Sequence, residues 1–76
     1  MTQLPAVTPK QLITALEKFG FVIRRQSGSH AIFSHPEKPG RVVVAIHVAA
    51  MKRRTLNGIL KQAGLTADEF LKLLGK

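Results

Sequence analysis

Three histidines are the side chains best suited to proton transfer in this chain: His30, His35 and His47. Imidazole gains and loses a proton close to neutral pH, so it can serve as an acid or as a base. His30 follows Gly28 and Ser29, where we expect the chain to turn sharply and present a side chain at the start of a strand. His35 precedes a proline at a loop edge, which favours an ordinary surface residue. His30 is therefore the first candidate for chemistry.

Other groups that carry chemistry are scarce. The chain has no cysteine, which excludes disulfides and thiolate nucleophiles. The four acidic residues fall on expected helix surfaces, helix caps and a loop, so they do not form the carboxylate pair of a metal-dependent nuclease. The histidine spacing matches no zinc pattern, and Ser29 has no evident histidine and acid to activate it as a nucleophile. We therefore expect neither a metal site nor a cofactor.

The charge is strongly unbalanced, with 12 Lys and Arg against 4 Asp and Glu and a net charge of +8. Such an excess attracts nucleic acid, an anionic membrane or an acidic protein. No apolar run is long enough to span a bilayer, and the first residues do not resemble a signal peptide, so we expect a cytoplasmic protein without membrane association.

RNA fits both the charge and the histidines. Its 2′-hydroxyl can attack the neighbouring phosphate without a metal, provided that a base removes the hydroxyl proton and an acid protonates the leaving oxygen. Cationic side chains then stabilise the charge that develops on phosphorus. DNA lacks this hydroxyl, so the chemistry would select RNA.

The length of 76 residues predicts a single domain over residues 1–76, with 1–7 as a flexible arm. Apolar residues at helical and at alternating spacing predict helices and strands, respectively. The expected elements are a helix between Thr8 and Gly20, strands over 21–26, 30–35 and 41–48, a helix that Thr55 caps, and a short helix over 67–74.

Short loops between the strands indicate an antiparallel meander with helices on one face. The sequence thus predicts a two-layer α+β fold of order αβββα plus a short C-terminal helix, which resembles the double-stranded-RNA-binding domain.

The expected strands bring two histidines together. Ala31 and Phe33 form the core pair of the second strand, so His30 points to the uncovered face. With a five-residue loop before the third strand, His30 lies opposite residue 46 or 47, and His47 becomes its cross-strand neighbour. His47 is therefore the candidate for a second proton-transfer group. Phe21 and Ile23 would face the core on the first strand, and Arg24 would emerge beside the histidines.

Basic residues flank these histidines in the sequence. A cluster just before the second expected helix suits phosphate contacts, although it also fits a solvated connector. The candidate RNA-binding residues are Arg24, Arg25, Ser29, Lys52, Arg53 and Arg54.

Four sequence runs extend these observations along the chain. They are LEKFGF at 16–21, RQSGSH at 25–30 with an aromatic residue at Phe33, VAIH at 44–47, and TLNGILKQAGL at 55–65. In this order the chain resembles the HicA (YcfA-like) family of toxins over about residues 8–70. The resemblance implies a double-stranded-RNA-binding-like fold and an mRNA interferase with His30 as its catalytic histidine. It also implies a type II toxin–antitoxin pair in which a HicB antitoxin covers the active site.

Two positions depart from the family pattern. The family often has proline where this chain has Ala45, and glycine where it has Arg54. Neither position changes His30, and Arg54 adds charge near the expected RNA path. Two alternatives stay open: a non-catalytic RNA-binding module, and an interaction protein whose basic face docks an acidic partner.

Overall fold

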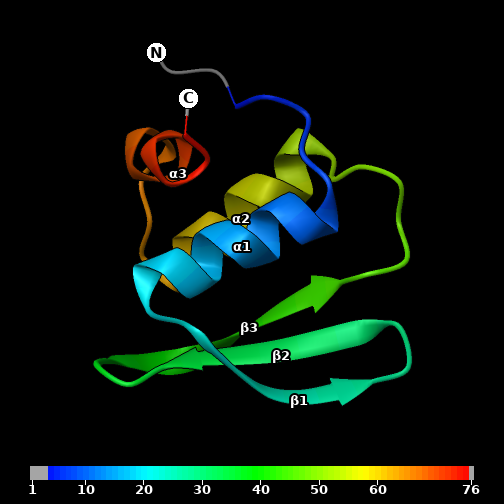
Figure 1. Ribbon diagram of the computed structural model, residues 1–76, viewed down its shortest axis with the longest axis vertical. Helices are drawn as coiled ribbons and strands as arrows, with labels where there is room; N and C mark the ends of the chain where they lie inside the picture. Colours follow the sequence, from blue (N-terminus) through cyan, green and yellow to red (C-terminus); the bar gives the residue numbers. More distant parts are fainter. Residues whose placement is uncertain (1–3, 76) are drawn as a thin grey trace.

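The structure, a computed structural model, describes residues 4–75. An antiparallel sheet in the order β1-β2-β3 forms one layer, and the helices lie on one side of it (Figure 1). The predicted α+β fold is therefore confirmed. The elements are α1 (Pro9–Phe19), β1 (Val22–Ser27), β2 (His30–His35), β3 (Lys38–Ala45), α2 (Arg53–Ala63) and α3 (Ala67–Leu73).

Helix α1 begins and ends as its local sequence predicts. The Thr8 hydroxyl accepts a hydrogen bond from the Gln11 N–H, and the Gln11 side chain accepts one from the Thr8 N–H. Pro9 occupies the first helical position, where its missing N–H costs nothing. Gly20 ends the helix with a φ of 109°, a conformation that disfavours any residue with a Cβ.

Helix α2 begins earlier than expected. The prediction that Thr55 caps it is wrong, because Lys52 is the N-cap and Thr55 already lies in the first turn. The start is set by the preceding residue: Met51 is buried and pairs with Val7, and its N–H donates to the Val7 carbonyl at 2.7 Å. None of the helices within residues 4–75 is long and apolar enough to cross a membrane.

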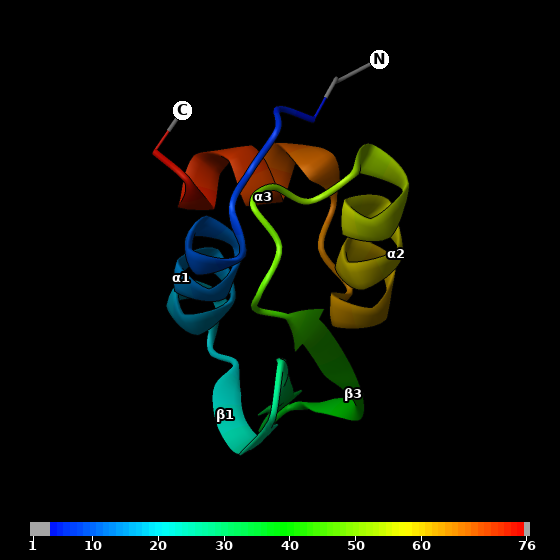
Figure 2. The same cartoon turned by 90° about the vertical axis from the view of Figure 1, so that its right-hand side faces the viewer.

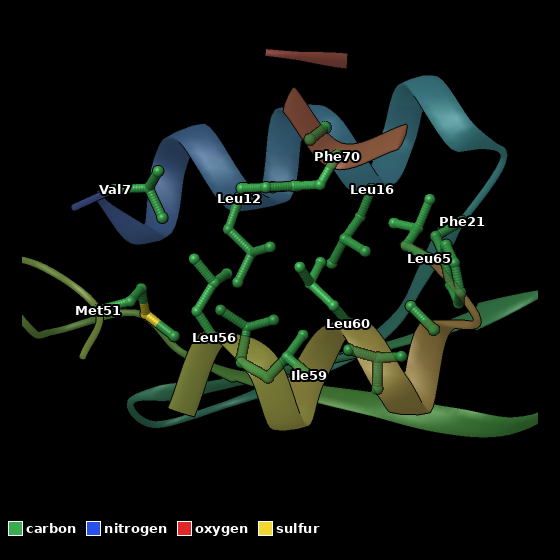
Figure 3. Close-up of a cluster of buried hydrophobic side chains, with 14 of the residues drawn as sticks. Val7, Leu12, Leu16, Phe21, Met51, Leu56, Ile59, Leu60, Leu65 and Phe70 are labelled. Carbon is green, nitrogen blue, oxygen red and sulfur yellow. The ribbon is translucent and has the colours of Figure 1, made fainter. Parts of the chain in front are cut away.

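The chain before α1 is packed rather than loose. Leu4 and Val7 are both buried in the core, so the prediction of a flexible arm over 1–7 is wrong for residues 4–7. Residues 1–3 of that predicted arm lie outside the described residues. Figure 3 shows Val7 beside Met51 at one end of the core, with the leucines of α1 and α2 meeting in its centre.

The helices cover the sheet unevenly. Ala31 and Phe33 of β2 are fully covered, as predicted, and α1 and α2 both pack against β3. In contrast, every residue of β1 is exposed. Ile23, which was expected in the core, pairs with Phe33 and so faces the helices, but it is 45% exposed because the helices pack mainly on β3 and not on β1. Phe21, which precedes β1, is buried as predicted.

Candidate functional site

His30 stands at the tip of the first hairpin. Gly28 and Ser29 form the two-residue turn between β1 and β2, and Ser27 pairs with His30 across its base. Gly28 has a φ of 56° at the first turn position, which is where a type II′ turn requires glycine. The His30 side chain is exposed, and the Ser29 hydroxyl lies 3.4 Å from its Nδ1 atom. The turn therefore presents an exposed imidazole.

The uncovered sheet face carries a cation next to His30. Directly opposed residues in antiparallel strands share a face, so Arg25, which pairs with Ile32, lies on the same face as His30. Arg25 is diagonal to His30 across the strand pair, a Cα separation of about 7–8 Å that a long side chain can bridge. The register skips Arg24 at a bulge, so Arg25 rather than Arg24 takes the place that was expected for Arg24.

His47 does not become a cross-strand neighbour of His30. The partner of His30 is Ala45, with which β3 ends, and the Ile46 N–H donates to the Ser29 carbonyl at 2.8 Å. The predicted pairing is wrong because the second hairpin loop is shorter than expected. His35 already pairs with Lys38, and the register shifts at a bulge between this pair and the next pair, Phe33 and Val42. His47 is exposed two residues beyond Ala45, within about 7 Å of chain.

The remaining candidates lie at the start of α2. Residues 46–52 connect the end of β3 to this helix and lie at the same end of the molecule as the β1–β2 turn (Figures 1 and 2). Lys52 is the N-cap, and Arg53 and Arg54 form the first turn, which has no acidic residue. A helix N-terminus already carries partial positive charge, so these three cations concentrate positive potential there.

A pocket of about 320 Å³ lies between the end of β3 and the start of α2. Its lining runs from Ala45, the partner of His30, through the connector to Lys52 and Thr55 at the helix start. The structure thus brings His30, Arg25 and the Lys52–Arg54 cluster to one end of the molecule. Sequence reasoning missed this pocket, although the apolar residues Val48 and Met51 within a basic connector were a signal for it.

His35 proves to be a structural residue and not the surface residue that its loop position indicated. The Glu37 N–H donates to its Nδ1 atom at 3.0 Å, so the ring hydrogen sits on Nε2, which lies 3.0 Å from the Phe19 carbonyl. The ring also contacts two aromatic residues, with centroid distances of 5.7 Å to Phe19 and 5.1 Å to Phe21. Both ring nitrogens are thereby engaged within the protein.

The acidic side chains lie apart from this site. In the cap of α3 the Thr66 N–H donates to the Glu69 carboxylate, and the Glu69 N–H donates to the Thr66 hydroxyl. Hydrogen bonding to the Thr66 backbone, and then to its side chain, lowers the pKa of the Glu69 carboxyl below its usual value. Among the residues that the structure describes, no three histidine, aspartate or glutamate side chains gather closely enough to hold a metal ion.

The fold and the site together define a small, strongly basic α+β protein with an exposed imidazole and several cations at one end of its sheet. A family model described as the HicA toxin of bacterial toxin–antitoxin systems matches residues 9–65, which include all three strands and the first two helices. The chain therefore belongs to the HicA toxin family, and it is a toxin whose system includes an antitoxin partner. A search of curated proteins found no match.

Proposed function

We propose that this toxin is an endoribonuclease that cleaves mRNA, with His30 as a proton-transfer group. The observation that carries the proposal is the placement of an exposed His30 at a hairpin tip, on the face that Arg25 shares. Membership of the HicA family and the net charge of +8 support the same substrate. Such an enzyme would act in the cytoplasm, where mRNA is translated.

The proposed reaction uses the substrate's own nucleophile. The 2′-oxygen bonds to phosphorus as a base takes its proton, and the bond from phosphorus to the 5′-oxygen breaks as an acid protonates that oxygen. The products are a 2′,3′-cyclic phosphate and a free 5′-hydroxyl. His30 takes one of these proton transfers, and His47 is the candidate for the other because it follows Ala45, the partner of His30, so closely. Arg25 and the Lys52–Arg54 cluster would hold phosphates.

A HicB-like antitoxin would inhibit the toxin by covering this face. Val22 and Val43 are about half exposed on the uncovered side of the sheet, close to cationic residues. Exposed apolar residues among charges are typical of a protein interface. This observation also favours the second candidate function, a basic protein that only docks an acidic partner and does not cut RNA.

The test is cleavage of a single-stranded RNA by the purified protein in excess EDTA. We expect products with 5′-hydroxyl ends, and no cleavage of DNA of the same sequence. His30→Ala should lower kcat by about 10²–10⁴-fold, the usual contribution of a positioned acid or base. His30 is exposed, so the variant should keep the melting temperature of the wild type.

Two further variants test whether the loss of kcat is specific to His30. His47→Ala removes the other exposed histidine and measures its share of the proton transfer, whereas Lys10→Ala removes an exposed cation on α1 and should leave kcat unchanged. Cleavage that needs added metal, or equal cleavage by His30→Ala, contradicts the proposal. Tight binding of an acidic protein without cleavage of RNA would favour the docking alternative.

A further inference from the structure

We infer that the pocket beside Ala45 binds one unstacked base of a single-stranded RNA, next to the phosphate at which His30 transfers a proton. This inference rests on the proposed ribonuclease function and names the form of its substrate. The pocket is lined by Ala45, Val48, Ala50, Met51, Lys52 and Thr55.

The position of the pocket ties it to the candidate site. Ala45 pairs directly with His30, so the pocket wall begins about 5 Å from the His30 backbone. The Ile46 N–H donates to the Ser29 carbonyl, which holds the end of β3 against the turn that carries His30. A nucleotide whose phosphate lies at His30 can therefore reach the pocket with its base.

The chemistry of the lining suits a base better than a phosphate. Val48, Met51 and the two alanines supply an apolar wall of the kind against which an extruded base packs. Thr55 places a hydroxyl at one side, and a hydroxyl can hydrogen-bond to the edge of any base. The pocket volume of about 320 Å³ lies at the lower end of the range for small-ligand sites, as a single base requires.

Charge indicates what kind of ligand carries that base. Lys52 lines the pocket, and Arg53 and Arg54 follow it in a first helical turn without acidic residues. Positive side chains at a helix N-terminus repel the positive end of the helix dipole, which lowers the stability of the free protein. A polyanion bound at the pocket mouth would be attracted both by these side chains and by the dipole. An apolar cavity bordered by cations fits one base attached to a phosphate backbone.

A base can enter the pocket only when it is neither paired nor stacked. The enzyme should therefore act on single-stranded RNA, although its fold resembles that of a double-stranded-RNA-binding domain. Duplex RNA would meet the same cations through its phosphates, but its bases would stay in the helix. Base insertion and phosphate binding thus make separate, measurable contributions to affinity.

Two neighbouring alanines provide a matched pair of variants. Ala50 and Ala49 are both exposed, but only Ala50 lines the pocket. Ala50→Met fills the cavity and Ala49→Met adds the same side chain outside it, and neither changes the net charge. The probe is a short fluorescent 2′-O-methyl RNA, which cannot be cleaved because its 2′-oxygen carries a methyl group. Binding is measured by fluorescence anisotropy for the single strand and for the same strand annealed to its complement.

We expect Ala50→Met to weaken binding of the single strand by about tenfold, because the added side chain occupies the space that the extruded base would fill. Ala49→Met should change it by less than about twofold, and neither variant should alter binding of the duplex. Thr55→Val, a change of similar volume in an exposed first turn, should weaken single-strand binding about threefold through loss of one hydrogen bond. It tests the pocket independently if the methionine variant folds poorly.

Failure of this inference differs from failure of the proposed function. If the wild type cleaves RNA and both Ala50→Met and Thr55→Val bind the single strand as it does, the base pocket is wrong and the ribonuclease stands. Equal losses for Ala49→Met and Ala50→Met also overturn it. If the wild type does not cleave RNA but Ala50→Met alone loses single-strand binding, the pocket stands and the ribonuclease is wrong.

Discussion

The two ends of strand β2 carry the same residue type in opposite environments. His30 begins the strand at a turn that only Gly28 and Ser29 form, and it is exposed. His35 ends the strand between two aromatic rings of the α1–β1 junction, with both nitrogens in hydrogen bonds. Five residues apart, one imidazole is exposed and the other is held in the fold by hydrogen bonds and ring contacts.

The two histidines differ because different parts of the chain lie near the two ends of β2. The α1–β1 junction approaches His35 so closely that a Cβ on Gly20 would lie 2.7 Å from its Nε2 atom. At the other end, a Cβ on Gly28 would meet nothing within 4 Å. The environment of His35 is thus set by tertiary neighbours, whereas His30 stays exposed because, within residues 4–75, no other part of the chain covers its turn.

Among variants at the two ends of β2, His35→Ala should lose the most stability. This variant loses two hydrogen bonds and the contacts with Phe19 and Phe21, which together contribute about 2–3 kcal/mol. The melting temperature should fall by roughly 10–15 °C in thermal unfolding followed by circular dichroism. His30→Ala is the control and should melt as the wild type does. Equal melting temperatures for both variants would remove the contrast between the two ends.

The next largest losses of stability are expected when Gly20 or Gly28 is replaced by alanine. Gly20→Ala imposes a side chain at a φ of 109° and against His35, and we expect it to cost about 2 kcal/mol. Gly28→Ala imposes one at a φ of 56° in open space and should cost about 1 kcal/mol. Urea unfolding measures both changes. Because His35 is the group that the new Cβ meets, the costs of Gly20→Ala and His35→Ala should add up to more than the cost of the double variant.

A smaller effect is expected at Lys38, the first residue of β3, which pairs with His35. Its Nζ atom donates to the carbonyls of Ala63 and Gly64 at the end of α2, at 3.3 and 3.4 Å, and lies 4.5 Å from the Phe19 ring centroid. Lys38→Met should lower the free energy of unfolding by about 1 kcal/mol. Lys10→Met also removes one charge, but from the first turn of α1, and should not destabilise the protein. A matching loss in both variants would mean that net charge matters and not the Lys38 contacts.

The smallest effect concerns pH and Glu69, whose carboxyl also faces the charge of Lys38. Its pKa is lowered in the folded protein, mainly by the Thr66 hydrogen bonds, so ionised Glu69 stabilises the fold above the pKa of the unfolded chain. That stability is lost as pH falls through the lower pKa of the folded state. Glu69→Gln keeps an acceptor oxygen for the cap but does not titrate. Urea unfolding at pH 7 and below pH 4 should therefore show a smaller loss for the variant, and equal losses would contradict this role of Glu69.

Much of the fold could be predicted from short stretches of the chain. The caps of α1 and α3 involve residues three positions apart, and the buried pair Ala31 and Phe33 follows from simple alternation. The turn at Gly28 and Ser29, and with it the exposure of His30, depends only on adjacent residues. Such features are determined locally because their partners lie within one turn of helix or two residues of strand.

Other features required the tertiary structure. The loop after His35 has two residues instead of the expected five. The partner of His30 is therefore Ala45, and His47 lies outside the sheet. The exposure of Ile23 depends on how far the helices extend over β1, and the early start of α2 depends on the pairing of Met51 with Val7.

The order of the elements, the charge and the exposed histidine of the first turn can therefore be read from the sequence. The strand register, the role of His35 and the pocket beside Ala45 follow only from the folded chain. They depend on contacts between residues far apart in the chain. The hydrogen bond from His35 to Phe19 spans 16 residues, and no local pattern specifies it.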